Sequence, residues 1–137
     1  MGEGGITLPK MIKKEKQIKL NLPWPPSVNS LYRINGKGKR AVVFKAKKAV
    51  AYANTVGWEL KRRKIEGFGT SRVEIDIQAY PPDRRRRDLD NIQKALLDSL
   101  QQAGVYQDDC QVDKITIARG PAVPEGMVVI DIKEIGL

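Results

Sequence analysis

The chain has 137 residues, which is the length of one domain, and a formal net charge of +9 at pH 7. Because it has no histidine and a single cysteine, it cannot form a Ser-His triad, a zinc finger or a histidine-ligated nuclease site. Residues 1–94 hold 22 lysines and arginines against 9 acidic residues, which indicates a polyanionic partner, either nucleic acid or an acidic membrane surface. No stretch is apolar enough for a membrane span or a secretion signal, and the lone Cys110 cannot form an internal disulfide, so we expect a soluble, cytoplasmic protein.

The first predicted strand follows a polar leader. Residues 1–15 are rich in glycine and lysine without a sustained period, so we expect a flexible basic leader ahead of a single domain of residues 16–137. Residues 17–22 alternate polar and apolar, which predicts a half-buried strand. The three prolines in residues 23–29 predict an extended turn, with Trp24 packed on the edge of the domain rather than on a DNA base.

A loop and a helix are predicted next. Residues 31–40 combine glycines with cations, which predicts a loop that either follows a phosphate backbone or is merely solvated. Apolar residues recur every three or four positions between Phe44 and Lys64, which predicts a helix ended by Gly67 and Gly69. This stripe consists of Ala46, Ala49, Val50, Ala53, Val56 and Leu60. The basic end of the helix either contacts DNA or only complements the helix dipole. The candidate DNA contacts of the loop and the helix end are Lys37, Lys39, Arg40, Lys61, Arg62 and Arg63.

The second half of the chain completes the predicted fold. Residues 73–80 alternate as a strand, and residues 89–103 carry a narrow apolar stripe that predicts a helix ended by Gly104. Residues 112–117 and 127–132 predict two more strands. The order β-α-β-α-β-β predicts a single α+β domain in which two helices cover a mixed sheet.

Two aspartates stand where the arginine run Arg84–Arg87 meets the second predicted helix. Inside a continuous helix, residues two positions apart are separated by about 200°, so Asp88 and Asp90 can share a ligand only if Asp88 is extended, at or before the N-cap. Aspartate is a favoured N-cap residue, so the sequence permits this arrangement, and both carboxylates could then bind one Mg²⁺. The alternative is that Asp88 caps the helix and Asp90 complements its dipole, which the spacing alone does not exclude.

Lys94 lies one helical turn beyond Asp90. It either forms an intrahelical ion pair or stabilises the charge of a metal-bound phosphate. Further along, Asp109 follows the helix and by itself is typical of a turn.

Three blocks of the sequence occur in a specific order and spacing. They are Leu22–Asn29 (LPWPPSVN), Pro82–Ala95 (PDRRRRDLDNIQKA) and Ala103–Val112 (AGVYQDDCQV). Together they resemble the RusA family of Holliday-junction resolvases, small endonucleases of bacteria, prophages and phages, over about residues 20–132.

The resemblance implies a homodimer that uses Mg²⁺ or Mn²⁺ to nick two opposed strands of four-way junction DNA symmetrically, in DNA recombination and repair. It also implies that Arg87 contacts DNA and that Lys94 is a catalytic lysine. The metal-binding catalytic carboxylates implied in the same way are Asp88, Asp90 and Asp109. We expect the neighbouring Arg84, Arg85 and Arg86 to bind phosphates together with Arg87.

The spacing of the carboxylates predicts how they meet. A helix over residues 89–103 is about 22 Å long, and the six residues from its end to Asp109 span at most about 20 Å. Asp109 of the same chain could barely reach Asp88, whereas Asp109 of a two-fold partner could reach it easily if the helices pack antiparallel. We therefore predict metal sites shared between the two subunits.

The predicted reaction is Mg²⁺-assisted hydrolysis of a phosphodiester, with a metal-bound water as the nucleophile. One alternative is a non-catalytic, basic DNA-binding protein whose aspartates only cap a helix. Another places a nuclease site around Asp76 and the acid-x-lysine pair Asp131 and Lys133, although these residues also fit the solvent face of ordinary strands. A membrane-surface protein is not favoured, because no basic amphipathic helix carries an exposed aromatic face.

Overall fold

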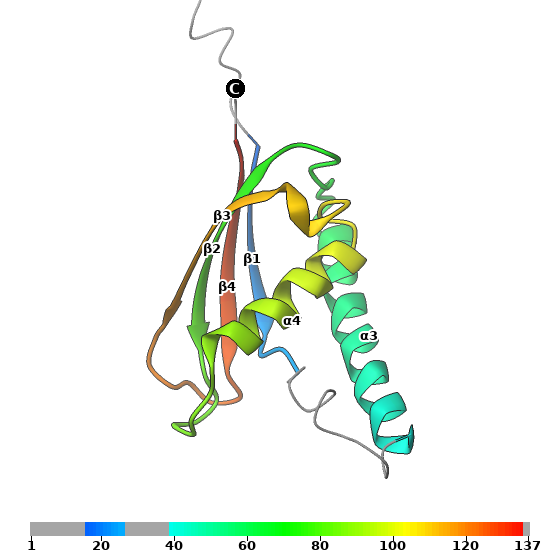
Figure 1. The fold of residues 1–137 in the computed structure, drawn as a ribbon. Coiled ribbons are helices and arrows are strands. Elements are labelled where there is room, and N and C mark those ends of the chain that lie inside the picture. Colours follow the sequence, from blue (N-terminus) through cyan, green and yellow to red (C-terminus); the bar gives the residue numbers. More distant parts are fainter. Residues whose placement is uncertain (1–15, 27–38, 136–137) are drawn as a thin grey trace, which may run out of the picture.

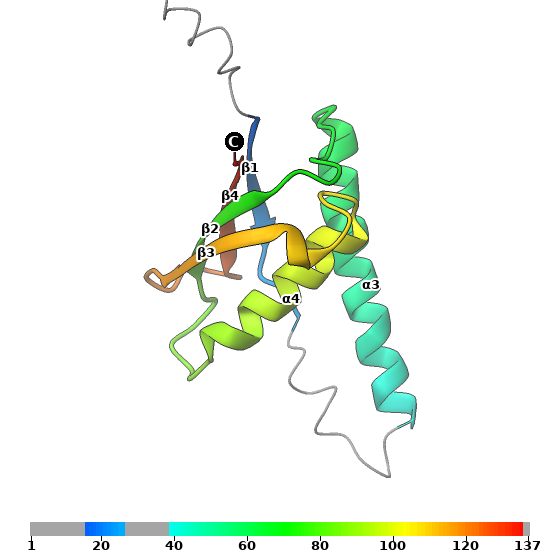
Figure 2. The ribbon, with the colours of Figure 1, turned by 45° about the horizontal axis from the view of Figure 1, so that its top comes forward.

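The computed structural model describes residues 16–26 and 39–135, and for residues 39–46 it describes the backbone alone. In this part of the chain a mixed four-stranded sheet carries two helices on one of its faces (Figure 1 and Figure 2). The α+β order predicted from the sequence, β-α-β-α-β-β, is confirmed. The elements are β1 (Gln17–Pro23), α3 (Lys39–Arg62), β2 (Val73–Tyr80), α4 (Leu89–Gln102), the 3-10 turn η1 (Asp109–Gln111), β3 (Val112–Arg119) and β4 (Met127–Glu134).

The sheet has the strand order β1-β4-β2-β3. β4 lies antiparallel between β1 and β2, while β3 runs parallel to β2 at the edge of the sheet. Two neighbouring parallel strands need a crossover connection. Here α4 supplies it, and residues 81–88 join the end of β2 to the start of α4. The buried strand residues that form the core with the helices are Ile18, Leu20, Leu22, Val73, Ile75, Ile77, Ala79, Val128, Ile130 and Ile132.

α4 buries the stripe that its sequence predicts, including Ile92, Leu96 and Leu100. It ends where Gly104 takes a left-handed backbone conformation with φ of 89°, which residues other than glycine adopt only with strain. The predicted helix and its glycine stop are thus confirmed, and α4 has a length of 14 residues, about 21 Å.

α3 differs from its predicted limits at both ends. The backbone of Lys39 and Arg40, predicted as loop, is already helical, since both residue types favour helix. The helix ends at Arg62, ahead of the two glycines, because Lys64 itself takes a left-handed conformation with φ of 55°.

Among the stripe residues whose side chains the structure describes, Val50 departs from the prediction, and the side chain of Ala46 lies outside the described part. Val50 is 51% exposed, whereas Tyr52 is buried and its hydroxyl donates a hydrogen bond of 2.7 Å to the carbonyl oxygen of Pro23. Two positions along a helix correspond to about 200°, so Val50 points away when Tyr52 points inward. Burial raises the pKa of the Tyr52 hydroxyl above its usual range.

The ends of the other helix and strands lie within two residues of those predicted from the sequence. β3 and β4 each extend two residues beyond their predicted ends. The predicted leader of residues 1–15 and Lys37 lie outside the described residues, as do the side chains of Lys39 and Arg40. Neither α3 nor α4 is long and apolar enough to cross a membrane.

Candidate active site

Asp88 is the residue immediately before α4, and it has the extended conformation that the sequence predicted, with φ of −86° and ψ of 133°. Asp90 lies in the first turn of the helix, and both residues are exposed. The Asp88 side chain makes no capping hydrogen bond, although aspartate at this position usually accepts one from the first turn. A capping hydrogen bond therefore does not account for Asp88, and the sharing of a ligand with Asp90 stays a prediction.

Lys94 follows Asp90 by one turn of α4 and is exposed. The N-terminus of a helix adds partial positive charge at the same end. Asp88 and the first two turns of α4 thus carry two carboxylates, one ammonium group and the positive end of the helix dipole.

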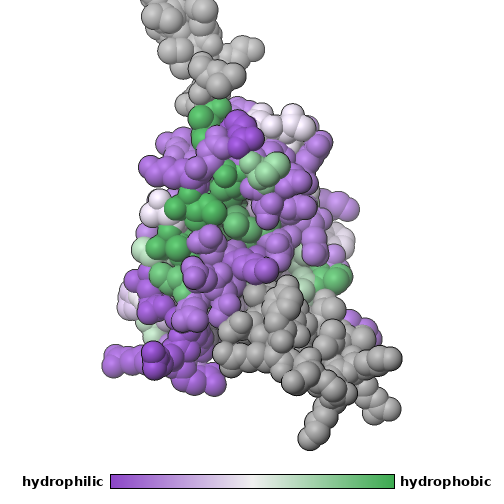
Figure 3. Space-filling view, viewed as in Figure 1, coloured by the Kyte–Doolittle hydropathy of each residue, from purple (hydrophilic) through white to green (hydrophobic). Residues whose placement is uncertain are grey.

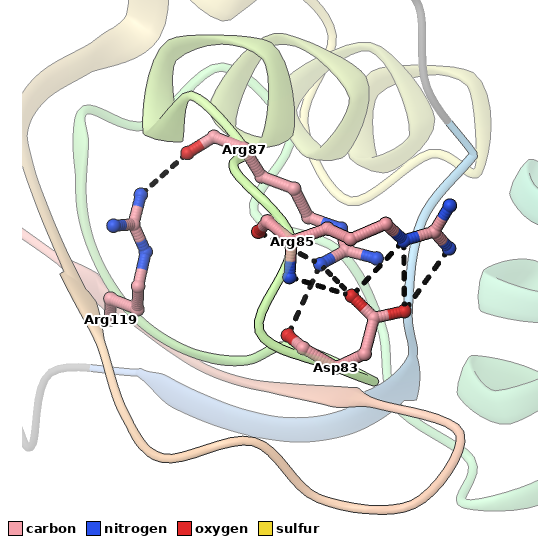
Figure 4. A network of polar contacts seen from close by, with 4 residues as sticks. All are labelled: Asp83, Arg85, Arg87 and Arg119. Atoms are coloured by element: carbon pink, nitrogen blue, oxygen red, sulfur yellow. Dashed lines mark hydrogen bonds and ion pairs between the residues drawn. The ribbon is translucent and has the colours of Figure 1, made fainter.

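The segment before Asp88 is organised by the carboxylate of Asp83 (Figure 4). Its Oδ1 accepts hydrogen bonds from Nη1 of Arg87 at 2.7 Å and from the backbone N–H of Arg85 at 2.9 Å. Its Oδ2 accepts from Nη2 of Arg85 at 3.1 Å. These bonds, above all the one from Arg87, hold the pKa of the Asp83 carboxyl well below its usual range. Asp83 is therefore ionised at neutral pH and binds two of the four consecutive arginines.

The guanidinium of Arg87 is enclosed by further groups. Its side chain is 19% exposed, and its guanidinium carbon lies 5.7 Å from the centre of the Trp24 ring. Trp24 is half-buried against the hydrophobic core, which confirms the prediction that its ring packs on the domain itself. The backbone oxygen of Arg87 accepts a hydrogen bond of 2.6 Å from Nη2 of Arg119 (Figure 4).

Arg84 and Arg86 differ from their neighbours. Both are exposed, and the described residues offer them neither a hydrogen bond nor an ion pair. The arginine run is thus divided into two side chains that are bound within the segment and two that point charge into solvent.

Asp109, the third predicted carboxylate, lies beyond the other end of α4. It opens η1, is exposed, and donates its backbone N–H to Oε1 of Gln101 at 3.0 Å. The preceding turn is anchored by Tyr106, whose buried ring extends its hydroxyl to the carbonyl oxygen of Leu97 at 2.8 Å.

A buried glutamine, Gln111, ties the Asp109 turn to the rest of the fold. Its side-chain oxygen accepts the backbone N–H groups of Gln107 and Asp108, both at 2.9 Å. Its Nε2 donates to the carbonyl oxygens of Gly69 at 2.9 Å and Ser71 at 2.8 Å. The side chain therefore uses both amide hydrogens and accepts two hydrogen bonds, which fixes the turn in one position.

One chain does not bring the three predicted carboxylates together. α4 separates Asp88 and Asp90 at its start from Asp109 beyond its end (Figure 1). Within the described residues, no three His, Cys, Asp or Glu side chains form a group that could hold a metal ion. A single chain thus supplies a pair of carboxylates at one end of α4 and a third carboxylate at the other.

The predicted DNA contacts at the end of α3 are partly engaged within the chain. Arg62 forms an ion pair of 2.6 Å with Glu59, and Nη1 of Arg63 donates to the carbonyl oxygen of Lys19 at 2.6 Å. Lys61 is exposed. Contact of this cluster with DNA stays a prediction.

The alternative site around Asp76 lies on the other face of the sheet. Asp76 and Asp131 are cross-strand neighbours on β2 and β4, and they alternate with the buried residues that face the helices. Asp131 accepts two hydrogen bonds from Nε2 of Gln17, at 2.8 and 3.0 Å. Lys133 lines the same polar hollow. These residues fit the solvent face of ordinary strands and do not join the site at Asp88.

The sequence did not predict the roles of Asp83, Gln111 and Arg119. The spacing of Asp83 to arginines two and four positions later is a local signal that could have indicated their pairing. Arg119 contacts a residue 32 positions away, and no local pattern announces such a contact.

Comparisons with known proteins show the family of this chain. The family model described as endodeoxyribonuclease RusA matches residues 23–133. A crossover junction endodeoxyribonuclease of Enterobacteria phage HK97 is 42% identical over 114 residues, which cover 83% of this chain and 92% of that protein. The crossover junction endodeoxyribonuclease RusA of Escherichia coli K12 is 38% identical over 117 residues, which cover 85% of this chain and 94% of that protein. These matches show that the chain belongs to the RusA family of endodeoxyribonucleases.

Proposed function

We propose that this chain is a Holliday-junction resolvase, which makes paired symmetric nicks in four-way DNA by Mg²⁺-dependent hydrolysis during recombination and repair. The observation that carries the proposal is the Asp88 carboxylate, which stands in extended backbone beside Asp90 and leaves the helix uncapped. Relatives 38–42% identical to the chain are described as crossover junction endodeoxyribonucleases and come from bacteria and phages. We therefore place its action on DNA in the bacterial cytoplasm.

The residues at the start of α4 fit a hard divalent cation. Mg²⁺ is commonly held by one or two carboxylates together with waters and substrate phosphates, so Asp88 and Asp90 would bind it, with Mn²⁺ as a substitute. The ion, when bound, polarises the scissile phosphate and lowers the pKa of a water. Lys94, exposed one helical turn beyond Asp90, would stabilise negative charge on that phosphate.

The arginine segment supplies two functions in this proposal. Arg84 and Arg86, exposed on either side of Arg85, bind the phosphates that flank the scissile bond. Arg85 and Arg87 give the segment its shape through Asp83. Arg85 keeps an exposed guanidinium that can also approach DNA.

A homodimer would complete the ligand set. Asp109 is exposed beyond the far end of α4, about 21 Å of helix away from Asp88. If the α4 helices of two copies run antiparallel about a two-fold axis, the partner brings its own Asp109 toward Asp88. We therefore propose two active sites, each built from the carboxylate pair of one subunit and Asp109 of the other.

The surface along β3 and α4 suits a second copy of this chain. β3 is an edge strand of the sheet, and Figure 3 shows apolar surface running along the strands between polar regions. Exposed edge strands with apolar side chains are places where chains pair. Docking a second copy here would cover these side chains and set the two α4 helices side by side. The half-covered apolar residues of β3 and α4 are Leu89, Leu97, Val112, Ile115 and Ile117.

The proposal is tested by incubating the protein with four-way, linear and flap DNA, with and without Mg²⁺. We expect paired nicks in the four-way junction that require the metal. Asp88→Asn is expected to abolish cutting while junction binding persists, because it removes a metal-binding charge and keeps the size of the side chain. Asp76→Asn, the same change on the other face of the sheet, is the matched control and is expected to cut normally.

Native cutting by the Asp88→Asn variant would refute the assignment. Loss of cutting by Asp76→Asn with Asp88→Asn active would instead favour the alternative site on the open face of the sheet. Salt-dependent junction binding by the unmodified protein, without nicking at any Mg²⁺ concentration, would indicate a DNA-binding protein without catalytic activity.

A further inference from the structure

The segment that carries Asp88 has little backbone support of its own. After β2 ends and before α4 begins, residues 83–87 make no hydrogen bond between backbone groups in the described part of the chain. The path of the chain up to Asp88 therefore depends on side-chain contacts, both from Asp83 within the segment and from residues elsewhere in the fold.

Arg119 provides one such contact. Its Nη2 atom donates to the carbonyl oxygen of Arg87 at 2.6 Å (Figure 4). That carbonyl belongs to the planar peptide unit that joins Arg87 to Asp88, so a bond to it fixes the plane from which the Asp88 side chain departs. Because the donor is a guanidinium, the hydrogen bond is charge-assisted and stronger than one between neutral groups.

The fold holds Arg119 firmly enough to act in this way. Arg119 is the last residue of β3 and pairs with Ala79 of β2, and the next residue, Gly120, donates its N–H to the Ala79 carbonyl at 2.8 Å. The Tyr80 ring packs so closely on Gly120 that a Cβ there would lie 2.6 Å from it. The base of the Arg119 side chain is therefore fixed to the end of the strand that leads into the arginine segment.

Arg87 is held from its other side as well. Its guanidinium binds Asp83 at 2.7 Å and lies over Trp24, while its carbonyl binds Arg119. The residue before Asp88 is thus held at both its side chain and its backbone, and the two contacts come from opposite directions along the chain.

We propose that Arg119 is a positioning residue of the active site, which acts through the Arg87 carbonyl to direct the Asp88 carboxylate toward the metal. The inference rests on the proposed function. It gives this exposed arginine a role other than phosphate binding, which would be the default expectation for a basic side chain in a nuclease.

The test compares Arg119→Ala, Arg119→Lys and the control Lys114→Ala, which removes the same charge from an exposed position of the same strand. Three quantities are measured for each variant. They are the junction affinity without divalent metal, the cleavage rate in single turnover at saturating enzyme, and the binding of Mn²⁺ by calorimetry.

Arg119→Ala is expected to bind the junction within about twofold of the native protein, to cut it at least about tenfold more slowly and to bind Mn²⁺ more weakly. Arg119→Lys is expected to recover most of both losses, since one N–H donor suffices for the carbonyl. Lys114→Ala is expected to match the native protein.

Two results would overturn the role of Arg119. The first is weaker junction binding by Arg119→Ala with a native rate at saturation, which would make Arg119 a phosphate contact. The second is an Arg119→Lys variant as slow as Arg119→Ala, since a restored donor would then have no effect. Either result, obtained beside a native protein that cuts junctions with Mg²⁺, leaves the proposed function intact. Failure of the native protein to cut would refute that function instead.

Discussion

Oδ1 of Asp83 lies 2.7 Å from Nη1 of Arg87, so the acidic residue at the start of the arginine run holds its last arginine, directly before Asp88. The arginine run is therefore folded around the Asp83 carboxylate, and its four guanidinium groups are not equally free to bind another anion. Arg84 and Arg86 project into solvent, whereas Arg85 and Arg87 share one carboxylate.

This division predicts an unequal dependence of DNA binding on salt. Each phosphate neutralised by a cation contributes about 0.9 to the slope of log affinity against log salt concentration for duplex DNA. Arg84→Ala and Arg86→Ala are each expected to flatten the slope by about 0.9, and Arg85→Ala by less than half as much, because Asp83 already neutralises that guanidinium. Fluorescence anisotropy of a labelled junction over a range of salt concentrations measures the slopes, with Lys114→Ala as the control for loss of one charge. An Arg85→Ala slope as flat as that of Arg84→Ala would contradict the division.

The same network predicts how Asp83 titrates. Its pKa in the folded chain is lowered by the hydrogen bonds from Arg87 and Arg85. The network therefore stabilises the fold above the ordinary aspartate pKa of about 3.9, and this stabilisation is lost as the pH falls through the lowered value. At about pH 3 we expect Asp83 to remain ionised in the folded protein, as measured by the ¹³C chemical shift of its carboxyl group.

Arg87→Ala removes the main cause of the shift, so it is expected to move the Asp83 titration upward toward the ordinary range. Arg84→Ala is the matched control, since it removes an arginine that does not bind Asp83, and it is expected to leave the titration unchanged. A native Asp83 that titrates near the ordinary value would show that the network does not persist in solution.

The elements that could be predicted from the sequence are those with a local period. The alternation in residues 73–80 and the apolar stripe of α4 gave the limits of β2 and α4 to within one residue. The start of α3 was wrong because its first turn is rich in cations, which were read as loop chemistry although lysine and arginine also favour helix. Tyr52 was not part of the predicted apolar stripe, although its ring is buried and its hydroxyl donates to the carbonyl of Pro23.

In the site, too, the features that depend on neighbouring residues could be predicted, and those that depend on distant residues could not. The extended conformation of Asp88 followed from the geometry of a helix start, which depends on neighbouring residues alone. The contacts of Arg119 and Gln111 join residues 32 to 42 positions apart, so they depend on which strand ends and turns the fold brings together. A single sequence carries no signal for such pairings.

Gln111 gives a prediction for stability. Gln111→Leu keeps a side chain of similar size but leaves two backbone N–H groups and two carbonyl groups without their partners. A polar group left without a partner costs about 1–3 kcal/mol when it is fully buried. These four groups belong to exposed or half-buried residues that water can reach, so each costs less, and we expect the free energy of unfolding to fall by about 2–4 kcal/mol in total in urea denaturation. The exposed Gln107 provides the control Gln107→Leu, for which we expect less than about 0.5 kcal/mol. A similar loss in both variants would indicate that the Asp109 turn is not fixed by Gln111.

The separation of Asp88 from Asp109 in one chain predicts complementation between two inactive proteins. If each site takes Asp88 from one subunit and Asp109 from the other, a heterodimer of Asp88→Asn and Asp109→Asn chains has both substitutions in one site and none in the second. One native site remains, so mixing and refolding the two inactive proteins together is expected to restore nicking of a single strand of the junction. If each chain supplies all three of its own carboxylates, both sites of the heterodimer are damaged and the mixture stays inactive.

Mixing Asp88→Asn with Asp90→Asn is the matched control, because these residues belong to the same end of α4 and their heterodimer has no intact site under the shared arrangement. Nicking by the first mixture alone would therefore identify the two-subunit site, whereas inactivity of the first mixture, with heterodimers present, would place Asp109 in the site of its own chain.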